Sequence, residues 1–181
     1  GWVDGESFMQ RDKELMDAYG RGHLAMEDYM AFSLEPLIGR TPEEIEHLVG
    51  PWVEDFIEPI IFSDATKTIA AHRKAGDRIL VISASGAHLV RPIADRLGID
   101  EILAIDLEVA HGVYSGNTVG TLPYRGGKIT RLLEWLDAVE ENLGGASFYS
   151  DSRNDLPLLL KVDFPHVVNP DPVLLEHAEK A

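Results

Sequence analysis

From Ser63 onward the sequence alternates between helical segments and short apolar runs, and this alternation constrains the fold more than any other feature. Residues 79–82 read Ile-Leu-Val-Ile, a continuous apolar run typical of a strand buried on both faces of a sheet. Helices are predicted at 63–75, 87–97, 128–136 and 155–161, and further strands at 102–104, 146–150 and 166–168. Such alternation predicts an α/β fold with a doubly wound parallel sheet.

The residues before Ser63 have a different pattern, which is helical throughout. Thr41 and Glu44 stand at the two positions of a capping box, so a helix is predicted to start between them. An apolar stripe follows that we interpret as helix packing: Ile45, Leu48, Val49, Trp52, Val53 and Phe56. The dipeptide Gly50-Pro51 predicts a kink or break in this helix.

The change of pattern divides the chain into two predicted parts. Residues 1–62 are expected to form a helical subdomain and residues 63–181 the α/β core. Within the core, three glycines predict a hairpin excursion: Gly112, Gly116 and Gly120.

Composition excludes several classes of partner and chemistry. With 16 Lys+Arg against 31 Asp+Glu, the formal net charge is -15, which repels nucleic acid and acidic membranes. A bound divalent cation could invert this field locally for an anionic ligand. The chain has no cysteine, which excludes disulfides and thiol nucleophiles and permits a reducing compartment. No apolar run approaches the ~18 residues that a membrane span needs. Nothing in the sequence predicts the oligomeric state.

Small polar residues follow the predicted strand at 79–82. Ligands of open parallel sheets bind beyond the carboxyl ends of the strands. Residues 83–86 read Ser-Ala-Ser-Gly, whose hydroxyl and N–H groups could hold a phosphate near the start of the next helix. Taken alone, the same residues are explained more simply by ordinary turn chemistry.

Acidic and amide side chains follow the predicted strand at 146–150. Asp151, Asn154 and Asp155 offer the oxygen ligands that magnesium prefers, one or two carboxylates with water and a phosphate completing its shell. The alternative is a helix cap with a solvated charge.

Lys128 opens a predicted helix after a glycine pair. It does not belong to a Walker A motif, because Leu122 and Ile129 occupy positions that the motif reserves for Gly and Ser/Thr. A surface charge is the alternative interpretation, although a cation at a helix start is mildly disfavoured and so hints at an anionic partner. The GxSxG, HExxH and GxGxxG motifs are absent, and the seven histidines are interpreted as structural or surface residues.

Taken in order, these segments resemble the haloacid dehalogenase (HAD) superfamily, in its branch similar to phosphoserine phosphatase. Ser83 after a buried strand looks like the second motif of that family, Lys128 like its third, and residues 151–155 like its fourth. The helical residues before the strand at 79–82 match the cap that this branch inserts between its first and second motifs.

The resemblance implies a role for each of these residues toward phosphate. Ser83 and the N–H groups of Ala84 and Ser85 would hold phosphoryl oxygens. Lys128 would neutralise charge on the phosphate and on the nucleophile, and Asn154 would donate to the phosphate or to the leaving group. These are positioning and electrostatic roles, as phosphoryl transfer requires.

The resemblance also implies a magnesium site. Asp151 would be a direct ligand, and Asp155 would lie behind it, acting through water or holding Lys128. The expected cofactor is therefore Mg²⁺.

One motif of the family is missing. Its first motif is a strand ending in Asp-x-Asp-x-Thr/Val, whose first Asp becomes phosphorylated, and no such motif precedes Ser83. We expect that strand to lie upstream of residue 1, and to sit between the strands at 79–82 and 147–150. Those two strands should then not pair with each other, and the chain should not fold without the missing strand.

The expected function is hydrolysis of a small phosphate monoester through an aspartyl-phosphate, in the cytoplasm. Phosphoserine and histidinol phosphate are substrates of similar proteins, and His23, Tyr29 and Arg40 are possible cap contacts. Two alternatives remain. One is an inactive HAD-like protein that binds phosphate and metal only, and the other is a doubly wound protein with no phosphate chemistry.

Overall fold

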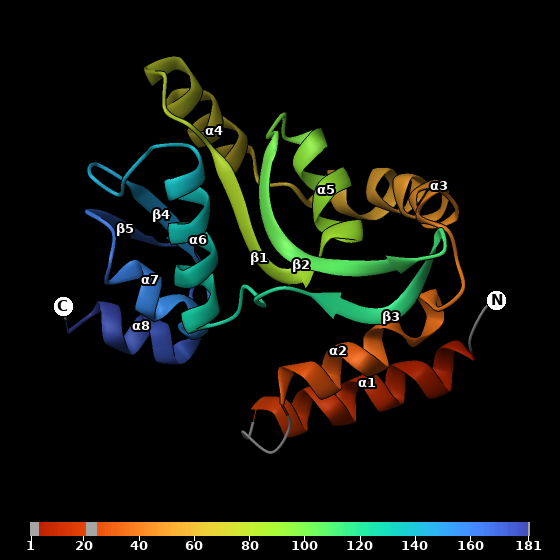
Figure 1. Ribbon diagram of the computed structural model, residues 1–181. Coiled ribbons are helices and arrows are strands. Elements are labelled where there is room, and N and C mark those ends of the chain that lie inside the picture. The colour runs from red at the N-terminus through yellow and green to blue at the C-terminus, as the bar shows by residue number, and fades with distance from the viewer. Residues whose placement is uncertain (1–3, 21–24, 181) are drawn as a thin grey trace. The chain divides into compact units, whose positions relative to one another are not determined.

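The computed structural model describes residues 4–20 and 25–180 (Figure 1). These residues form two compact units. The first ends at Pro59 and also contains Asp106–Val119, whereas the second contains Ile60–Ile105 and resumes at Gly120. The grouping of residues 106–119 with the first unit is not foreseen by the sequence analysis, and the assignment of 1–62 as a cap stays a prediction.

The second unit alternates strands and helices, which confirms the α/β fold class. Its strands are β1 (Leu80–Gly86), the first half of β2 (Glu101–Ala110), β4 (Ser147–Ser150) and β5 (Phe164–Val167). Its helices are α4 (Ser63–Ala75), α5 (Ala87–Arg96), α6 (Gly126–Ala138), α7 (Leu156–Leu159) and α8 (Pro172–Ala178), with a 3-10 turn at Arg153–Asp155.

Two strands are longer than the sequence pattern predicts. β1 continues past residue 82 to Gly86, with a register irregularity between Ile82 and Gly86. β2 runs to Ala110 because its second half pairs with an antiparallel neighbour. Short apolar runs mark only the buried part of a strand, and the more polar continuations depend on a partner strand.

The strands belong to two sheets. β1 pairs with β2 in parallel, with Leu80 opposite Glu101, and β4 pairs with β5 in parallel, with Ser147 opposite Phe164. Within the described part of the chain β1 and β4 do not pair, as predicted. What lies between them stays a prediction.

A single apolar cluster joins both sheets of the second unit. Its buried members come from β2, α6 and α7: Leu103, Leu132, Leu136 and Leu158. Ile82 of β1 and Phe148 of β4 pack against the same cluster. In Figure 1, α6 lies between β1 and β4 in the view. The residues at the start of α6 are therefore anchored to the core that carries both strands.

The first unit contains α1 (Gly5–Gly20), α2 (Met26–Leu34), a 3-10 turn at Glu35–Leu37 and α3 (Pro42–Trp52). The capping box at the start of α3 is confirmed. Thr41 Oγ1 accepts from the Glu44 N–H at 3.1 Å, and Glu44 Oε2 accepts from the Thr41 N–H at 2.8 Å. Phe8 of α1 stacks on Phe32 of α2 with ring centroids 4.6 Å apart.

The apolar stripe of α3 packs only in part. Ile45, Val49 and Val53 are buried, but the second row of the stripe is exposed: Leu48, Trp52 and Phe56. The two rows lie about 60° apart around a helix of 3.6 residues per turn, so one neighbour need not cover both. Beyond Trp52 the helix continues as a π turn at Val53–Ile57 and a 3-10 turn at Glu58–Ile60. The break expected at Gly50-Pro51 is thus a change of helix type, next to a proline that lacks the N–H donor.

The predicted hairpin is formed by the second half of β2 and β3 (Val113–Val119). His111 and Gly112 have φ of 53° and 82°, the paired left-handed values of a tight two-residue hairpin turn. Backbone bonds join the hairpin to the segment before α3, from Gly39 N–H to the Tyr114 carbonyl and from Tyr114 N–H to the Arg40 carbonyl. Among the described helices, none is both long and apolar enough to cross a bilayer.

Candidate active site

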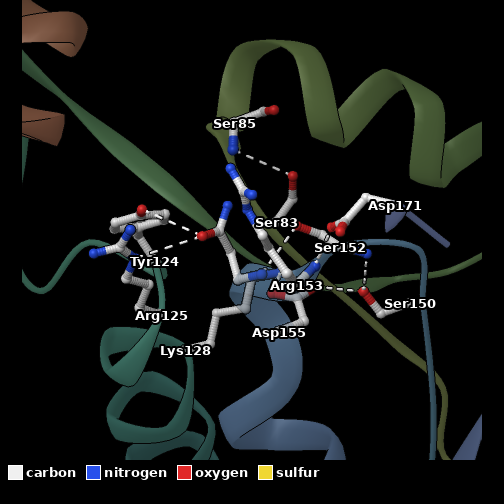
Figure 2. A network of polar contacts seen from close by, with 11 residues as sticks. Ser83, Ser85, Tyr124, Arg125, Lys128, Ser150, Ser152, Arg153, Asp155 and Asp171 are labelled. Atoms are coloured by element: carbon white, nitrogen blue, oxygen red, sulfur yellow. Dashed lines mark hydrogen bonds and ion pairs between the residues drawn. The ribbon is translucent and has the colours of Figure 1, made fainter. Parts of the chain in front are cut away.

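The central feature of the site is an ion pair between Lys128 and Asp155. The Lys128 Nζ lies 2.7 Å from Asp155 Oδ1 and 2.8 Å from Oδ2. Both residues are 7% exposed. The Ser150 hydroxyl, at the end of β4, donates to Asp155 Oδ2 at 2.7 Å (Figure 2). A buried charge needs such partners, because an unpaired one is strongly destabilising.

The backbone before α6 explains how Lys128 reaches this position. Arg125 has φ of 48°, an uncommon value for a residue with a side chain. A Cβ on Gly127 would lie 2.0 Å from the Leu122 carbonyl oxygen, so only glycine fits there. The Gly127 N–H donates to the Tyr124 carbonyl at 2.8 Å. This tight turn starts α6 at Gly126, two residues before Lys128, and the ammonium lies in the buried ion pair.

The segment after β4 is held by short-range side-chain bonds. The Ser150 Oγ accepts from the Ser152 N–H at 3.1 Å, and the Ser152 Oγ accepts from the Asn154 N–H at 3.2 Å. Asp171, in the cap position of α8, accepts from the Arg153 N–H. Burial raises the pKa of Asp171, but backbone N–H donors, that of Arg153 foremost, lower it by more, so its net pKa lies below its ordinary value. Asp171 therefore anchors this loop as a carboxylate.

Asn154 links this loop to the turn before Lys128. Its Oδ1 accepts from the Tyr124 hydroxyl at 3.4 Å and from the Arg125 Nε at 3.5 Å. The Arg125 guanidinium also lies 5.0 Å from the centroid of the Tyr124 ring. The structure thus brings Lys128, Asn154 and Asp155 together, three of the residues that the sequence singled out.

Ser83 is the fourth of the seven residues of β1, so it lies within the strand and not after it as predicted. Its Oγ accepts from the Ser85 N–H at 3.2 Å. Figure 2 draws both serines in the same close view as Lys128 and Asp155. The Ser85 N–H expected to hold a phosphate is thus already used within its own segment. The contact of Ser83, Ala84 and Ser85 with a shared phosphate stays a prediction.

Asp151 differs from Asp155 in its surroundings. It is exposed, its carbonyl accepts from the Asp171 N–H at 2.8 Å, and its carboxylate has no partner among the described residues. Within 4–20 and 25–180 no group of three or more acidic or histidine side chains could hold a metal. A single available carboxylate fits magnesium, which completes its shell with water and phosphate. It does not fit metals that need several protein ligands.

Asp155 has little capacity left for a metal. Both oxygens face Lys128 and one also accepts from Ser150. Of the two roles expected for Asp155, holding Lys128 is the one visible here, and a metal-ligand role stays a prediction.

Sequence reasoning missed four contributors: Tyr124, Arg125, Ser150 and Asp171. Two of these signals are visible in the sequence: Ser150 is a polar residue at the end of a strand, and Tyr124 and Arg125 directly precede the glycine pair. The sequence does not show which residues they contact.

His88, which the sequence analysis interprets as a structural or surface residue, lies just after the Ser83 segment. Burial lowers its pKa to about 4, and its Nδ1 is buried without a partner in the described residues.

The possible cap contacts are not tested by the structure. His23 lies outside the described residues. The Tyr29 hydroxyl donates to Asp12 Oδ1 at 3.0 Å within the first unit. A substrate role for Tyr29 or Arg40 stays a prediction.

The second unit is an α/β core with a buried lysine–aspartate pair beyond a strand end. Comparison with known proteins gives the family of this chain. The family model of haloacid dehalogenase-like hydrolases matches residues 5–160. The chain therefore belongs to the haloacid dehalogenase-like hydrolase family. This confirms the predicted resemblance.

Individual relatives agree with this assignment. A protein of Neisseria meningitidis serogroup C named histidinol-phosphatase is 35% identical over 184 residues, covering 99% of this chain and 83% of the relative. The crystal structure of a protein of unknown function from Bordetella pertussis Tohama I matches with a TM-score of 0.92 and 34% identity, over 98% of this chain and 81% of that one. A phospho-aspartyl intermediate analogue of phosphoserine phosphatase shares the fold, with a TM-score of 0.66 and 21% identity over 92% and 77% of the two chains.

Proposed function

We propose that this HAD-family phosphatase is a cytoplasmic, magnesium-dependent enzyme that hydrolyses a small phosphate monoester through an aspartyl-phosphate intermediate. The observation that carries the proposal is the buried ammonium of Lys128, fixed by Asp155 and Ser150. A preorganised cation in a water-poor site stabilises the charge that develops during phosphoryl transfer. The absence of cysteine fits a reducing compartment.

Each residue of the site has its own role in the proposed reaction. Lys128 neutralises negative charge on the phosphoryl group and the nucleophile, while Asp155 keeps its ammonium in place. Ser83 binds a phosphoryl oxygen, and Asn154 donates from its amide nitrogen. Asp151 holds Mg²⁺, which when bound supplies further positive charge beside the phosphate.

The nucleophile is a carboxylate that these 181 residues do not supply in the expected motif, since they contain no Asp-x-Asp sequence. We propose that a strand outside them carries it and lies between β1 and β4. Two observations support this: the two strands belong to separate sheets, and both pack on the same apolar cluster. In the reaction the carboxylate oxygen bonds to phosphorus as the ester P–O bond breaks, the leaving alcohol is protonated, and water then releases phosphate.

The favoured substrate is histidinol phosphate, with phosphoserine second. The preference rests on the name of the Neisseria relative and its 35% identity, because the phosphoserine phosphatase structures share only the fold. Both substrates are small amines with a primary phosphate ester, so the chemistry at phosphorus is the same.

A panel of phosphate esters tests the proposal. Phosphate release by full-length protein is measured with histidinol phosphate, phosphoserine, nucleoside monophosphates and a sugar phosphate, each with Mg²⁺. Efficient hydrolysis of a small amino-alcohol phosphate is expected. Binding of inorganic phosphate without hydrolysis of any ester would instead identify a protein that only binds.

A further inference from the structure

The side-chain amide of Asn154 has a defined orientation. Its Oδ1 faces two donors, the Tyr124 hydroxyl at 3.4 Å and the Arg125 Nε at 3.5 Å. Amide oxygen and nitrogen are easily exchanged in a structure, and a hydroxyl could satisfy either. A guanidinium has donors only, so the atom that faces Arg125 has to be the oxygen. The amide nitrogen of Asn154 therefore points away from Arg125.

That nitrogen is free to bind a ligand. Within the described residues the Asn154 Nδ2 has no hydrogen-bond acceptor, while the backbone N–H of the same residue is used by the Ser152 Oγ. Asn154 also directly precedes Asp155, the partner of Lys128. Two N–H donors are thus available one residue from the buried ion pair.

Arg125 is itself held in place. Its φ of 48° and the close approach of Gly127 to the Leu122 carbonyl set the backbone, and its guanidinium lies 5.0 Å from the Tyr124 ring centroid. A cation is attracted to the face of an aromatic ring, so this contact further restrains the guanidinium. The same turn begins the helix that carries Lys128, so one backbone element sets both the ammonium and the amide.

We propose that Tyr124 and Arg125 are positioning residues, which hold the Asn154 amide so that its N–H groups donate to an oxygen of the phosphate monoester. The inference rests on the proposed function and deepens it. In this role Arg125 does not contact the substrate. The alternative role is that of a direct phosphate ligand, which is common for an arginine near a phosphate site. The two roles make different predictions.

A double-mutant cycle separates them. Full-length wild type, Arg125→Met, Asn154→Ala and the double variant are assayed for kcat and KM on the best ester of the panel. If Arg125 acts through Asn154, the substitution Arg125→Met should lower kcat about 10-fold, which is the order expected for the loss of one charge-assisted hydrogen bond. In the Asn154→Ala background the same change should cost less than about 2-fold. Tyr124→Phe should behave likewise with a smaller loss.

Two control variants distinguish the loss of the Arg125 Nε donor from a general loss of positive charge. Lys161→Met removes one exposed positive charge from the same unit and should leave kcat unchanged. Arg125→Lys keeps the charge without the Nε donor and should not restore wild-type kcat. Equal losses from Arg125→Met in both backgrounds, or no loss in either, would overturn the positioning role.

Inorganic phosphate keeps this test separate from the proposed function. If wild type hydrolyses no ester, the cycle is repeated on the calorimetric Kd of inorganic phosphate. A loss of affinity in Arg125→Met that disappears in the Asn154→Ala background upholds the positioning role even though the phosphatase proposal fails. Additive losses, or no loss, reject it.

Discussion

The ammonium nitrogen of Lys128 lies within 2.8 Å of both carboxylate oxygens of Asp155, and both side chains are nearly fully buried. The pair joins the start of α6 to the turn after β4, two segments far apart in sequence. The contribution of each of the two residues to stability and activity can be measured.

Lys128→Met should damage both stability and activity in the full-length protein. Among the described residues it leaves the buried Asp155 carboxylate with Ser150 as its one side-chain partner, a change that typically costs about 3–5 kcal/mol. Turnover should fall by several orders of magnitude, because the variant loses a charge that stabilises the transition state. The double variant Lys128→Met/Asp155→Leu should regain much of the stability and none of the activity. Urea unfolding and phosphate release measure the two effects. Stability that does not recover in the double variant would contradict the view that the unpaired charge causes the loss.

The neighbouring glycines Gly126 and Gly127 should respond very differently to alanine. A Cβ on Gly127 would meet the Leu122 carbonyl oxygen at 2.0 Å, whereas a Cβ on Gly126 has nothing within 4 Å. Gly127→Ala should lower the free energy of unfolding by about 3 kcal/mol or more and displace Lys128. Gly126→Ala should be neutral or stabilise by about 0.5–1 kcal/mol, since it removes freedom from the unfolded chain. Chemical denaturation of the two variants gives the comparison, and equal effects would contradict the close approach of Gly127 to the Leu122 carbonyl.

His88 should make the protein less stable as the pH falls. Burial lowers its pKa to about 4 from an unfolded value of 6.5. Between these values the unfolded chain binds the proton and the folded protein does not. Stability is therefore fully present above pH ~6.5 and is lost as the pH falls toward ~4, by at most about 3 kcal/mol from this residue.

His88→Leu tests this contribution. The difference in unfolding free energy between pH 7.5 and pH 4.5 should shrink in His88→Leu relative to wild type. His177→Gln, at an exposed position, should leave the difference unchanged. The same pH dependence in all three proteins would show that His88 titrates normally.

The sequence predicts the elements of the second unit well because their signals are local. The apolar run at 79–82 can be recognised from neighbouring residues alone. The same is true of Gly76 and Gly98, which follow the helices α4 and α5. Lys128 and residues 151–155 could be found as well, since they follow a glycine pair and a buried strand. The family motifs then suggested that Lys128 and Asp155 meet.

The missed features depend on contacts that local sequence patterns do not predict. Ser150 contacts Asp155, five residues further on, because the turn after β4 brings the carboxylate back over the end of the strand. Arg125 contacts Asn154, which lies 29 positions away in sequence. The second half of β2 is a strand because β3 pairs with it. The periodicity of a helix or strand does not predict such contacts. The same holds for the apolar stripe of α3, where burial of one row and exposure of the other depend on which neighbouring segments pack against each row.

Magnesium dependence of turnover is the decisive property of the proposed phosphatase. Phosphate release from the best ester is measured against Mg²⁺ concentration for full-length wild type, Asp151→Asn and Asp155→Asn, with excess chelator as the zero point. Wild type should be inactive with chelator and should recover activity with Mg²⁺. Asp151→Asn should lose both magnesium affinity and turnover, since a charged ligand is removed. Asp155→Asn should keep more of the magnesium affinity, because Asp155 mainly holds Lys128. Undiminished wild-type turnover in chelator would contradict magnesium-dependent hydrolysis, and an Asp151→Asn variant that titrates with Mg²⁺ like wild type would contradict the role of Asp151 as a magnesium ligand.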